Sequence, residues 1–324
     1  MTLLAGGDLA VEGRQRLREV LAEAGGVMGS GRSAGAAGPR PVTPFGSAEP
    51  VEGDDIAAVP VGDPLEGSRD AAFADGIQRY IVEGRIGVTP IVRAHVGAAV
   101  LRRCDRVLHP VQYEAEEIIV ASLDRLPDRV VAALHDTGFT VCDCGVGDRE
   151  HPILDVQLAV QTVEDRRRRA ELRVVTAFRR AFPDDWMVID GSLRPYGRTV
   201  RESRALGVIK SHETQFFAGR DLEIALTLPE GHRTTVFRRT QESYDTILSW
   251  YVRLWDWAGE DILFGLLRLE CEEGEHVIGE VNDVCRWMLA ERAPIATPDG
   301  RWDRLLYPIR EVESYLRAKA GSWW

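Results

Sequence analysis

The sequence is poor in several features that would place it quickly in a class of proteins. Its 324 residues include only five cysteines, which are odd in number and scattered, so they predict neither a disulfide framework nor a zinc-finger spacing. No apolar run approaches the ~18 to 20 residues that cross a bilayer, and no charged segment leads into an apolar one at the N-terminus. We therefore expect a cytoplasmic protein with no membrane association.

Basic residues are outnumbered by acidic ones, 40 to 51, so the formal net charge is −11. This balance argues against a protein that coats nucleic acid, because non-specific affinity for DNA comes mainly from neutralising phosphates. An enzyme with a local basic track is still compatible, and Arg166 to Arg169 form such a run, although a solvated helix face is the simpler interpretation. Only two of the 40 basic residues are lysine, Lys210 and Lys319. A cramped polar site can require a compact ammonium group where a planar guanidinium does not fit.

The residue pattern divides the chain into three predicted parts. Residues 1–25 form a helical appendage, residues 26–68 a linker rich in Gly, Pro and Ala, and residues 69–324 the main domain. In the main domain we predict strands over 69–101, 139–144, 186–190, 205–211, 232–240, 250–255 and 262–270, and helices over 111–136, 162–182, 274–293 and 304–319. Strands, a crossover helix, further strands and then helices indicate an α/β domain with a mixed sheet flanked by helices.

Two of these strands carry an Asp-Gly pair after an apolar run. Trp186-Met-Val-Ile leads into Asp190-Gly, and Ala71-Ala-Phe-Ala leads into Asp75-Gly. Asp-Gly between hydrophobic strands is a strong hairpin signal, so two turns are one interpretation. The other is a pair of carboxylates held side by side on a sheet, where together they could bind a divalent metal.

Two helices add acidic residues to this pair. Glu171 lies on the apolar stripe of the helix over 162–182, and Glu313 lies on that of the C-terminal helix. A buried carboxylate needs a cation, a proton or hydrogen bonds, because burying it unpaired costs several kcal/mol. Asp75, Glu171, Asp190 and Glu313 are hard oxygen donors of the kind that Mg²⁺ or Mn²⁺ prefers, and Lys210 ends a neighbouring apolar strand. Enzymes that cleave phosphodiesters use such a set.

The order of these motifs resembles that of the NurA family of nucleases. The matching segments are Ala74-Asp75-Gly76, Arg169-Ala-Glu171-Leu, Asp190-Gly-Ser-Leu193, Gly207-Val-Ile-Lys210, and Tyr307-Pro308 with Glu313 five residues after the proline. The similarity covers roughly residues 69–320. The chain departs from the family pattern at Ile77, where a serine is common, and at Glu313, where aspartate or histidine is more familiar. Glu311 is therefore a competing candidate for the last ligand.

The resemblance implies an RNase H-like fold and a metal-dependent DNA nuclease stimulated by Mn²⁺ or Mg²⁺. In such an enzyme Asp75, Glu171, Asp190 and Glu313 would hold the metal, and Lys210 would assist catalysis. The resemblance further implies a 5′ to 3′ exonuclease and single-strand endonuclease. It would work as a homodimer on a hexameric HerA-type ATPase, in DNA end processing or anti-phage defence. The linker, the N-terminal helix or Trp323-Trp324 would then be docking elements.

Other interpretations remain open at this stage. A catalytically inactive scaffold of the same fold and another RNase H-like nuclease that cleaves RNA or hybrids both fit the motifs. His212 would point to the same side as Lys210 if the strand continues, and could touch substrate. Arg268 and Glu270 are expected to form a structural ion pair, and no phosphate-binding loop of the GxxxxGK[ST] type is found, so the chain is not itself the ATPase.

Overall fold

The computed structural model describes residues 5–28, 46–66, 69–104, 107–147, 151–202, 204–212, 214–239, 246–274, 277–292 and 306–323. The strands are β1 (Val27–Met28), β2 (Ala48–Pro50), β3 (Ala58–Pro60), β4 (Ala71–Ile86), β5 (Thr89–Cys104), β6 (Val107–Ala121), β7 (Thr140–Asp143), β8 (Trp186–Asp190), β9 (Ala205–Ile209), β10 (His232–Thr234), β11 (Phe237–Arg239), β12 (Ile247–Arg253) and β13 (Leu266–Glu272). The α-helices are α1 (Ala5–Glu23), α2 (Asp128–His135), α3 (Pro152–Ala181), α4 (Arg198–Arg201), α5 (Gly219–Leu226), α6 (Val277–Glu291) and α7 (Tyr307–Ala320). Short 3₁₀ turns cover Leu123–Arg125 and Gly321–Trp323.

One mixed sheet runs through the molecule, with the strand order β2-β11-β12-β13-β9-β8-β4-β5-β6-β7 along its main path. Within it, β4 pairs with β8 and β8 with β9 in parallel, while β5 is antiparallel to both β4 and β6. This order and these directions over β6-β5-β4-β8-β9 are those of an RNase H-like fold. The predicted fold class, a mixed sheet flanked by helices with an additional N-terminal helix, is confirmed.

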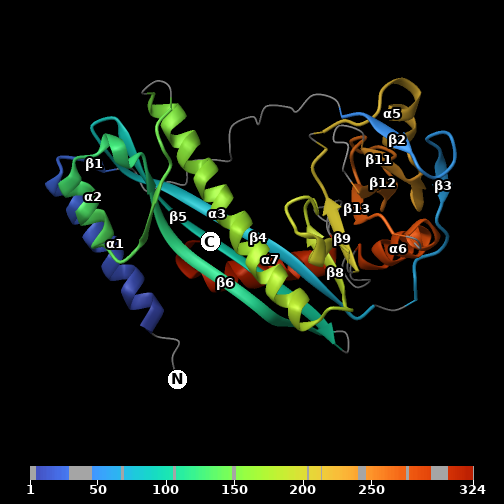
Figure 1. Cartoon of the computed structure of the whole chain (residues 1–324), viewed down its shortest axis with the longest axis horizontal. Helices are drawn as coiled ribbons and strands as arrows, with labels where there is room; N and C mark the ends of the chain where they lie inside the picture. Colours follow the sequence, from blue (N-terminus) through green and yellow to red (C-terminus); the bar gives the residue numbers. More distant parts are fainter. Residues whose placement is uncertain are drawn as a thin grey trace.

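Helices cover the two faces of the central strands (Figure 1). On one face α3 packs through Val174, Val175 and Phe178 onto the even-numbered alanines of β4. On the other face α7 packs through its apolar stripe onto Phe73 and Ile77, the odd-numbered positions of the same strand. The alternation of side chains along a strand therefore separates two cores.

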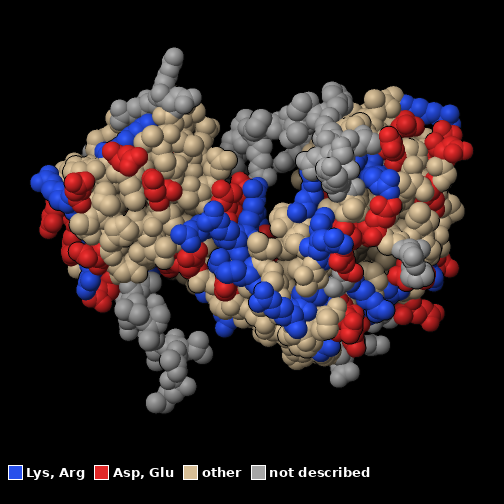
Figure 2. All heavy atoms as spheres, in the orientation of Figure 1, with Lys and Arg blue, Asp and Glu red and all other residues tan. Residues whose placement is uncertain are grey.

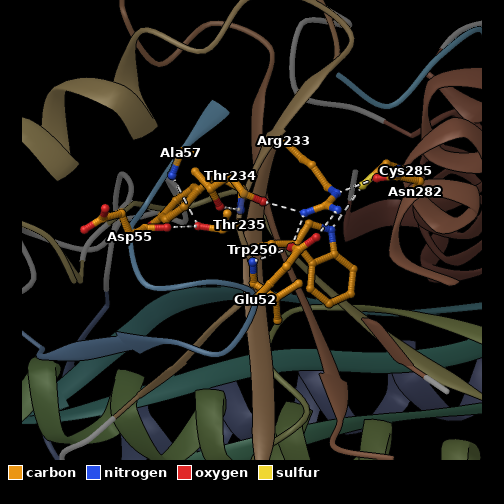
Figure 3. A network of polar contacts seen from close by, with 11 residues as sticks. Glu52, Asp55, Ala57, Arg233, Thr234, Thr235, Trp250, Asn282 and Cys285 are labelled. Atoms are coloured by element: carbon orange, nitrogen blue, oxygen red, sulfur yellow. Dashed lines mark hydrogen bonds and ion pairs between the residues drawn. The ribbon is translucent and has the colours of Figure 1, made fainter. Parts of the chain in front are cut away.

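The segment predicted as a linker is partly built into the sheet. Within residues 46–66, β2 pairs with β11 and β3 pairs with β10, so this stretch does not behave as a linker. Glu52 fixes it to the body, because both of its carboxylate oxygens accept from the buried guanidinium of Arg233, at 2.6 and 2.8 Å (Figure 3). Strands of three residues are too short to produce a visible alternation, which explains the error. Residues 29–45 lie outside the described residues, and the division into three parts otherwise stays a prediction.

The prediction of a helix over residues 111–136 is wrong for its first half. Residues 107–121 form β6, which pairs with β5 along nearly its whole length, and only α2 at Asp128–His135 is an α-helix. The segment Glu114 to Glu117 is rich in helix-forming residues, yet pairing with β5 overrides that local preference. The other predicted elements of the main domain are present, with boundaries shifted by a few residues or more.

The connection from α3 to β8 is fixed by a buried arginine. Arg179 is 1% exposed, and its guanidinium donates to the backbone carbonyl oxygens of Phe182, Pro183 and Asp185, at 2.8 to 3.2 Å. These bonds satisfy carbonyl groups just past the helix end and hold the chain where it enters β8. No described helix is long and apolar enough to cross a membrane.

Candidate active site

The two predicted aspartates lie next to each other on neighbouring strands. The parallel pairing of β4 with β8 ends at Ala74 and Ile189, and the next residues are Asp75 and Asp190. β8 ends at Asp190, and Gly191 turns the chain with a φ of 111°, as predicted for an Asp-Gly pair. At Asp75 the interpretation of a turn is wrong, because the pairing of β4 with β5 carries the strand on to Ile86.

Gly76 serves a purpose other than a turn. A Cβ atom built on Gly76 would lie 2.7 Å from both Cγ and Cδ of Glu171 and closer still to Oε1. The missing side chain therefore leaves the space in which Glu171 of α3 lies against β4. In β4 the Asp-Gly pair thus supplies the carboxylate of Asp75 and, at Gly76, the space for the carboxylate of Glu171.

Lys210 joins the same group of side chains. It directly follows β9, which lies beside β8, and its Nζ is 2.8 Å from Oδ2 of Asp190. Burial acts to lower the pKa of Lys210, but the charges of Asp190 and Asp75 outweigh it, so its pKa is raised. The lysine is therefore a firmly protonated ammonium group beside the aspartate pair.

The carboxylates are close enough to perturb one another. Burial raises the pKa of Asp75 well above its ordinary value, and the neighbouring negative charges of Asp190 and Glu171 raise it further, against the opposing effect of Lys210. The pKa of Glu171 is also raised, by burial first, although its ion pair with Arg167 opposes this. Like charges that converge in a partly buried place favour a proton or a cation.

Tyr196 is part of this site, and sequence reasoning missed it. It lines a small pocket together with Asp75, Glu171 and Asp190. Burial raises the pKa of its hydroxyl, and the charge of Glu171 adds to the effect. Arg167 is a second member that was missed: it pairs with Glu171, and its Nε donates to Gln78 at 3.2 Å. The spacing of four residues between Arg167 and Glu171 on one helix was the available signal.

The loop after Asp190 is held by a buried carboxylate. Glu270 is fully buried, and its Oε2 accepts from Ser192 Oγ at 2.7 Å and from the backbone N–H of Leu193 at 3.1 Å. Its other oxygen, Oε1, is 2.6 Å from Nη1 of Arg268, so the expected ion pair is present. Ser192 and Leu193 of the Asp-Gly-Ser-Leu motif thus anchor the chain that carries Asp190.

Glu313, the fourth predicted acidic residue, lies at the edge of the candidate active site. Glu313 forms an ion pair with Arg317 one turn along α7, and its charge contributes to the raised pKa of Lys210. Glu311, the competing candidate, instead accepts a hydrogen bond from Tyr307 on the same helix. Glu313 is therefore the one of the two whose charge acts on the site, through Lys210.

Whether these residues fit a metal depends on their donor chemistry and their arrangement. Asp75, Glu171 and Asp190 offer only carboxylate oxygens, which suit Mg²⁺ or Mn²⁺. Over the described ranges, no group of three or more Asp, Glu, His or Cys side chains is arranged so that it could hold a metal ion. Two of the three carboxylates are instead paired with Arg167 and Lys210. The donors fit, but a cation would have to replace these partners.

The other residues singled out in the sequence, His212 and Trp323, make packing and hydrogen-bond contacts within the protein itself. His212 Nε2 lies 3.1 Å from the backbone oxygen of Leu266, and its ring lies beside Tyr251. Trp323 packs into the protein's own core, while Trp324 lies outside the described residues.

Basic side chains gather over the middle of the face along which α3 runs (Figure 2). Several arginines of α3 are balanced by acidic neighbours: Arg168 is 2.8 Å from Glu164, and Arg173 is 2.7 Å from Glu114. Both arginine side chains remain about half exposed. The surface beside the acidic site is therefore mixed in charge, with a local concentration of guanidinium groups on an otherwise acidic protein.

Comparison with known proteins gives one finding of note. The crystal structure of the NurA nuclease from Sulfolobus solfataricus is similar to this chain with a TM-score of 0.44 and 11% sequence identity, over 78% of this chain and 80% of that chain. No family model matches the sequence, and no curated protein matches it.

Proposed function

We propose that this protein is a metal-dependent nuclease that hydrolyses DNA phosphodiester bonds. The observation that carries the proposal is the convergence of Asp75, Glu171 and Asp190, with the ammonium group of Lys210, where the parallel pairing of β4 and β8 ends. Burial and neighbouring negative charge raise the pKa of Asp75 and of Glu171, so keeping these carboxyl groups together is costly to the fold. A cation-binding role explains why a protein would keep them together.

In the proposed hydrolysis, the acidic residues, Lys210 and the residues that hold Asp190 have separate roles. Asp75, Glu171 and Asp190 would hold Mn²⁺ or Mg²⁺, with Glu313 as the fourth acidic group. When bound, the ion supplies Lewis acidity towards the phosphodiester and its attacking water. Lys210 places a fixed positive charge where negative charge develops on the phosphate oxygens. Glu270 and Arg179 keep Asp190 in place from both sides along the chain.

The substrate and setting follow from the motif resemblance and are part of the proposal. The enzyme would act on DNA ends and single strands, with 5′ to 3′ exonuclease polarity, and would form a homodimer that works with a hexameric HerA-type ATPase. End processing in repair or defence against invading DNA are the two settings. The basic surface over α3 supports a nucleic acid as the substrate (Figure 2).

A second candidate is favoured by one observation. Arg167 and Lys210 already neutralise two of the three carboxylates, which is what an inactive scaffold of the same fold would need in order to be stable. A scaffold would bind its partner and cleave nothing. A nuclease specific for RNA or hybrids would differ only in its substrate.

One assay separates these functions. Purified protein is incubated with end-labelled single-stranded DNA, duplex DNA, RNA and a DNA–RNA hybrid, each with Mn²⁺, with Mg²⁺ and with EDTA. The proposal predicts cleavage of DNA that depends on the metal. Cleavage of RNA or the hybrid alone would establish the other nuclease, and no cleavage of any substrate under these conditions would favour the scaffold.

A further inference from the structure

Arg167 is held by two partners at the candidate active site, and different nitrogen atoms bind them. Its Nη1 forms the ion pair with Oε1 of Glu171, while its Nε donates to Oε1 of Gln78 at 3.2 Å. The side chain is 22% exposed, and its charge opposes the rise in the pKa of Tyr196, which lines the same small pocket as Glu171. The guanidinium group therefore belongs to the site and not to the outer surface of α3.

The packing of α3 on β4 places Arg167 and Glu171 together. Four residues of a helix rise about 6 Å, and two residues of a strand rise about 6.6 Å. Glu171 fills the space left by Gly76. One turn earlier on α3, Arg167 contacts Gln78, which is two residues further along the same face of β4. The matching spacings therefore fix the arginine beside the glutamate.

The ion pair competes with a metal ion for the same carboxylate oxygen. Oε1 of Glu171 accepts from Arg167, and a divalent ion bound to this oxygen would repel the guanidinium at contact distance. The bond from Nε of Arg167 to Gln78 uses neither Glu171 nor Nη1. An arriving ion therefore frees Nη1 while Nε keeps the guanidinium beside the metal site.

We propose that Arg167 exchanges Glu171 for a phosphate oxygen of the nucleic acid when the metal ion binds. A guanidinium pairs with phosphate through forked donors, and one held a single helical turn from Glu171 is suited to a phosphate that contacts the ion. In the metal-free protein the same group neutralises Glu171. This inference rests on the proposed nuclease function and adds a substrate-binding residue to it.

The first test is calorimetric titration of the full-length, metal-free protein with Mn²⁺. Arg167→Gln removes the competing charge and should bind Mn²⁺ at least about tenfold more tightly than the wild type. Damage to the fold would weaken metal binding, so a merely structural role of Arg167 does not produce this result. Gln78→Ala changes no charge and should tighten Mn²⁺ binding by about threefold, because it releases the guanidinium from its anchor.

The matched control is Arg168→Gln, which removes the same charge from the next residue of α3. Arg168 lies 2.8 Å from Glu164, and its side chain is 53% exposed, so water and salt screen its charge. Its charge acts on Glu171 without an ion pair between them, so this variant measures the effect of charge alone. Its Mn²⁺ affinity should change by less than about threefold. Equal tightening in Arg167→Gln and Arg168→Gln, or none in either, would overturn the inference.

The second test measures cleavage of single-stranded DNA at saturating Mn²⁺. Loss of a phosphate contact should raise the KM of Arg167→Gln by about tenfold relative to that of Arg168→Gln, with a smaller change in kcat. An equal KM in the two variants would overturn the phosphate contact. A wild type that binds no Mn²⁺ or cleaves no DNA would instead overturn the proposed function, and the inference with it.

Discussion

The space at Gly76 gives the sharpest prediction about the site. Replacing Gly76 with alanine places a methyl group 2.7 Å from Cγ and Cδ of Glu171. Carbon atoms in contact are about 3.5 to 4.0 Å apart, so Glu171 must move by roughly 1 Å or more. The clash is with a flexible side chain and not with backbone, so the carboxylate can swing away while the sheet stays intact.

The expected result is a variant that is folded and poorly active. A misplacement of about 1 Å in a catalytic group can reduce the rate about a hundredfold. Stability should change little, because alanine is favoured over glycine inside a strand by about 0.5 to 1 kcal/mol, which offsets the displacement of Glu171. The measurements are the rate of DNA cleavage with Mn²⁺ and the thermal unfolding midpoint.

Gly97 provides the matched control. It lies on β5 opposite Ile77, and a Cβ atom there would meet its nearest neighbours at 3.6 Å, an ordinary contact distance. Gly97→Ala should therefore keep both activity and stability. If Gly76→Ala cleaves DNA as fast as Gly97→Ala, Glu171 does not need to lie against β4, and its assignment to the site is refuted.

Three further predictions concern Glu270, Asp75 and Trp323. Glu270→Gln should lower the free energy of unfolding by about 3 to 5 kcal/mol in chemical denaturation, because it leaves Arg268 buried opposite a neutral group; an unchanged value would contradict the role of Glu270 as an anchor. Because the pKa of Asp75 is raised above its ordinary 3.8 on folding, the contribution of this carboxyl group to wild-type stability should fall as pH rises above about 4. With EDTA present, Asp75→Asn should gain in stability relative to wild type from pH 4 towards neutral, and a difference that does not depend on pH would refute this. Trp323→Ala should lower the free energy of unfolding by about 3 to 5 kcal/mol, since the ring is buried and stacked on Arg93; a loss below 1 kcal/mol would argue against that packing.

The sequence predicts the central part of this fold because its signals are local there. The apolar run before Asp190 and the stripe on α3 identify a strand and a helix without knowledge of the rest of the chain. The strand β6 was mistaken for a helix because its partner β5, and not its own composition, determines its conformation. The strands β2 and β3 were missed because three residues carry too little pattern.

In the site, too, some residues are marked by their local sequence, and others are placed only by contacts between distant parts of the chain. Asp75, Asp190 and Lys210 could be predicted because each ends or interrupts an apolar run, and parallel strands bring such ends together. Tyr196 lies in an irregular loop, so nothing in its local sequence places it near Glu171. Glu270 was identified as half of an ion pair, but its contact with Ser192 joins residues far apart in the chain, and only the folded structure shows it.

In the proposed function, the acidic residues beside Lys210 form a metal-dependent catalytic centre for DNA cleavage. The most direct test compares Mn²⁺-dependent cleavage of single-stranded DNA by the wild type, Asp190→Asn and Asp184→Asn, the last being an exposed acidic residue just before β8. We expect Asp190→Asn to lose at least about a hundredfold in rate, while Asp184→Asn should cleave like the wild type. Full activity in Asp190→Asn would contradict it.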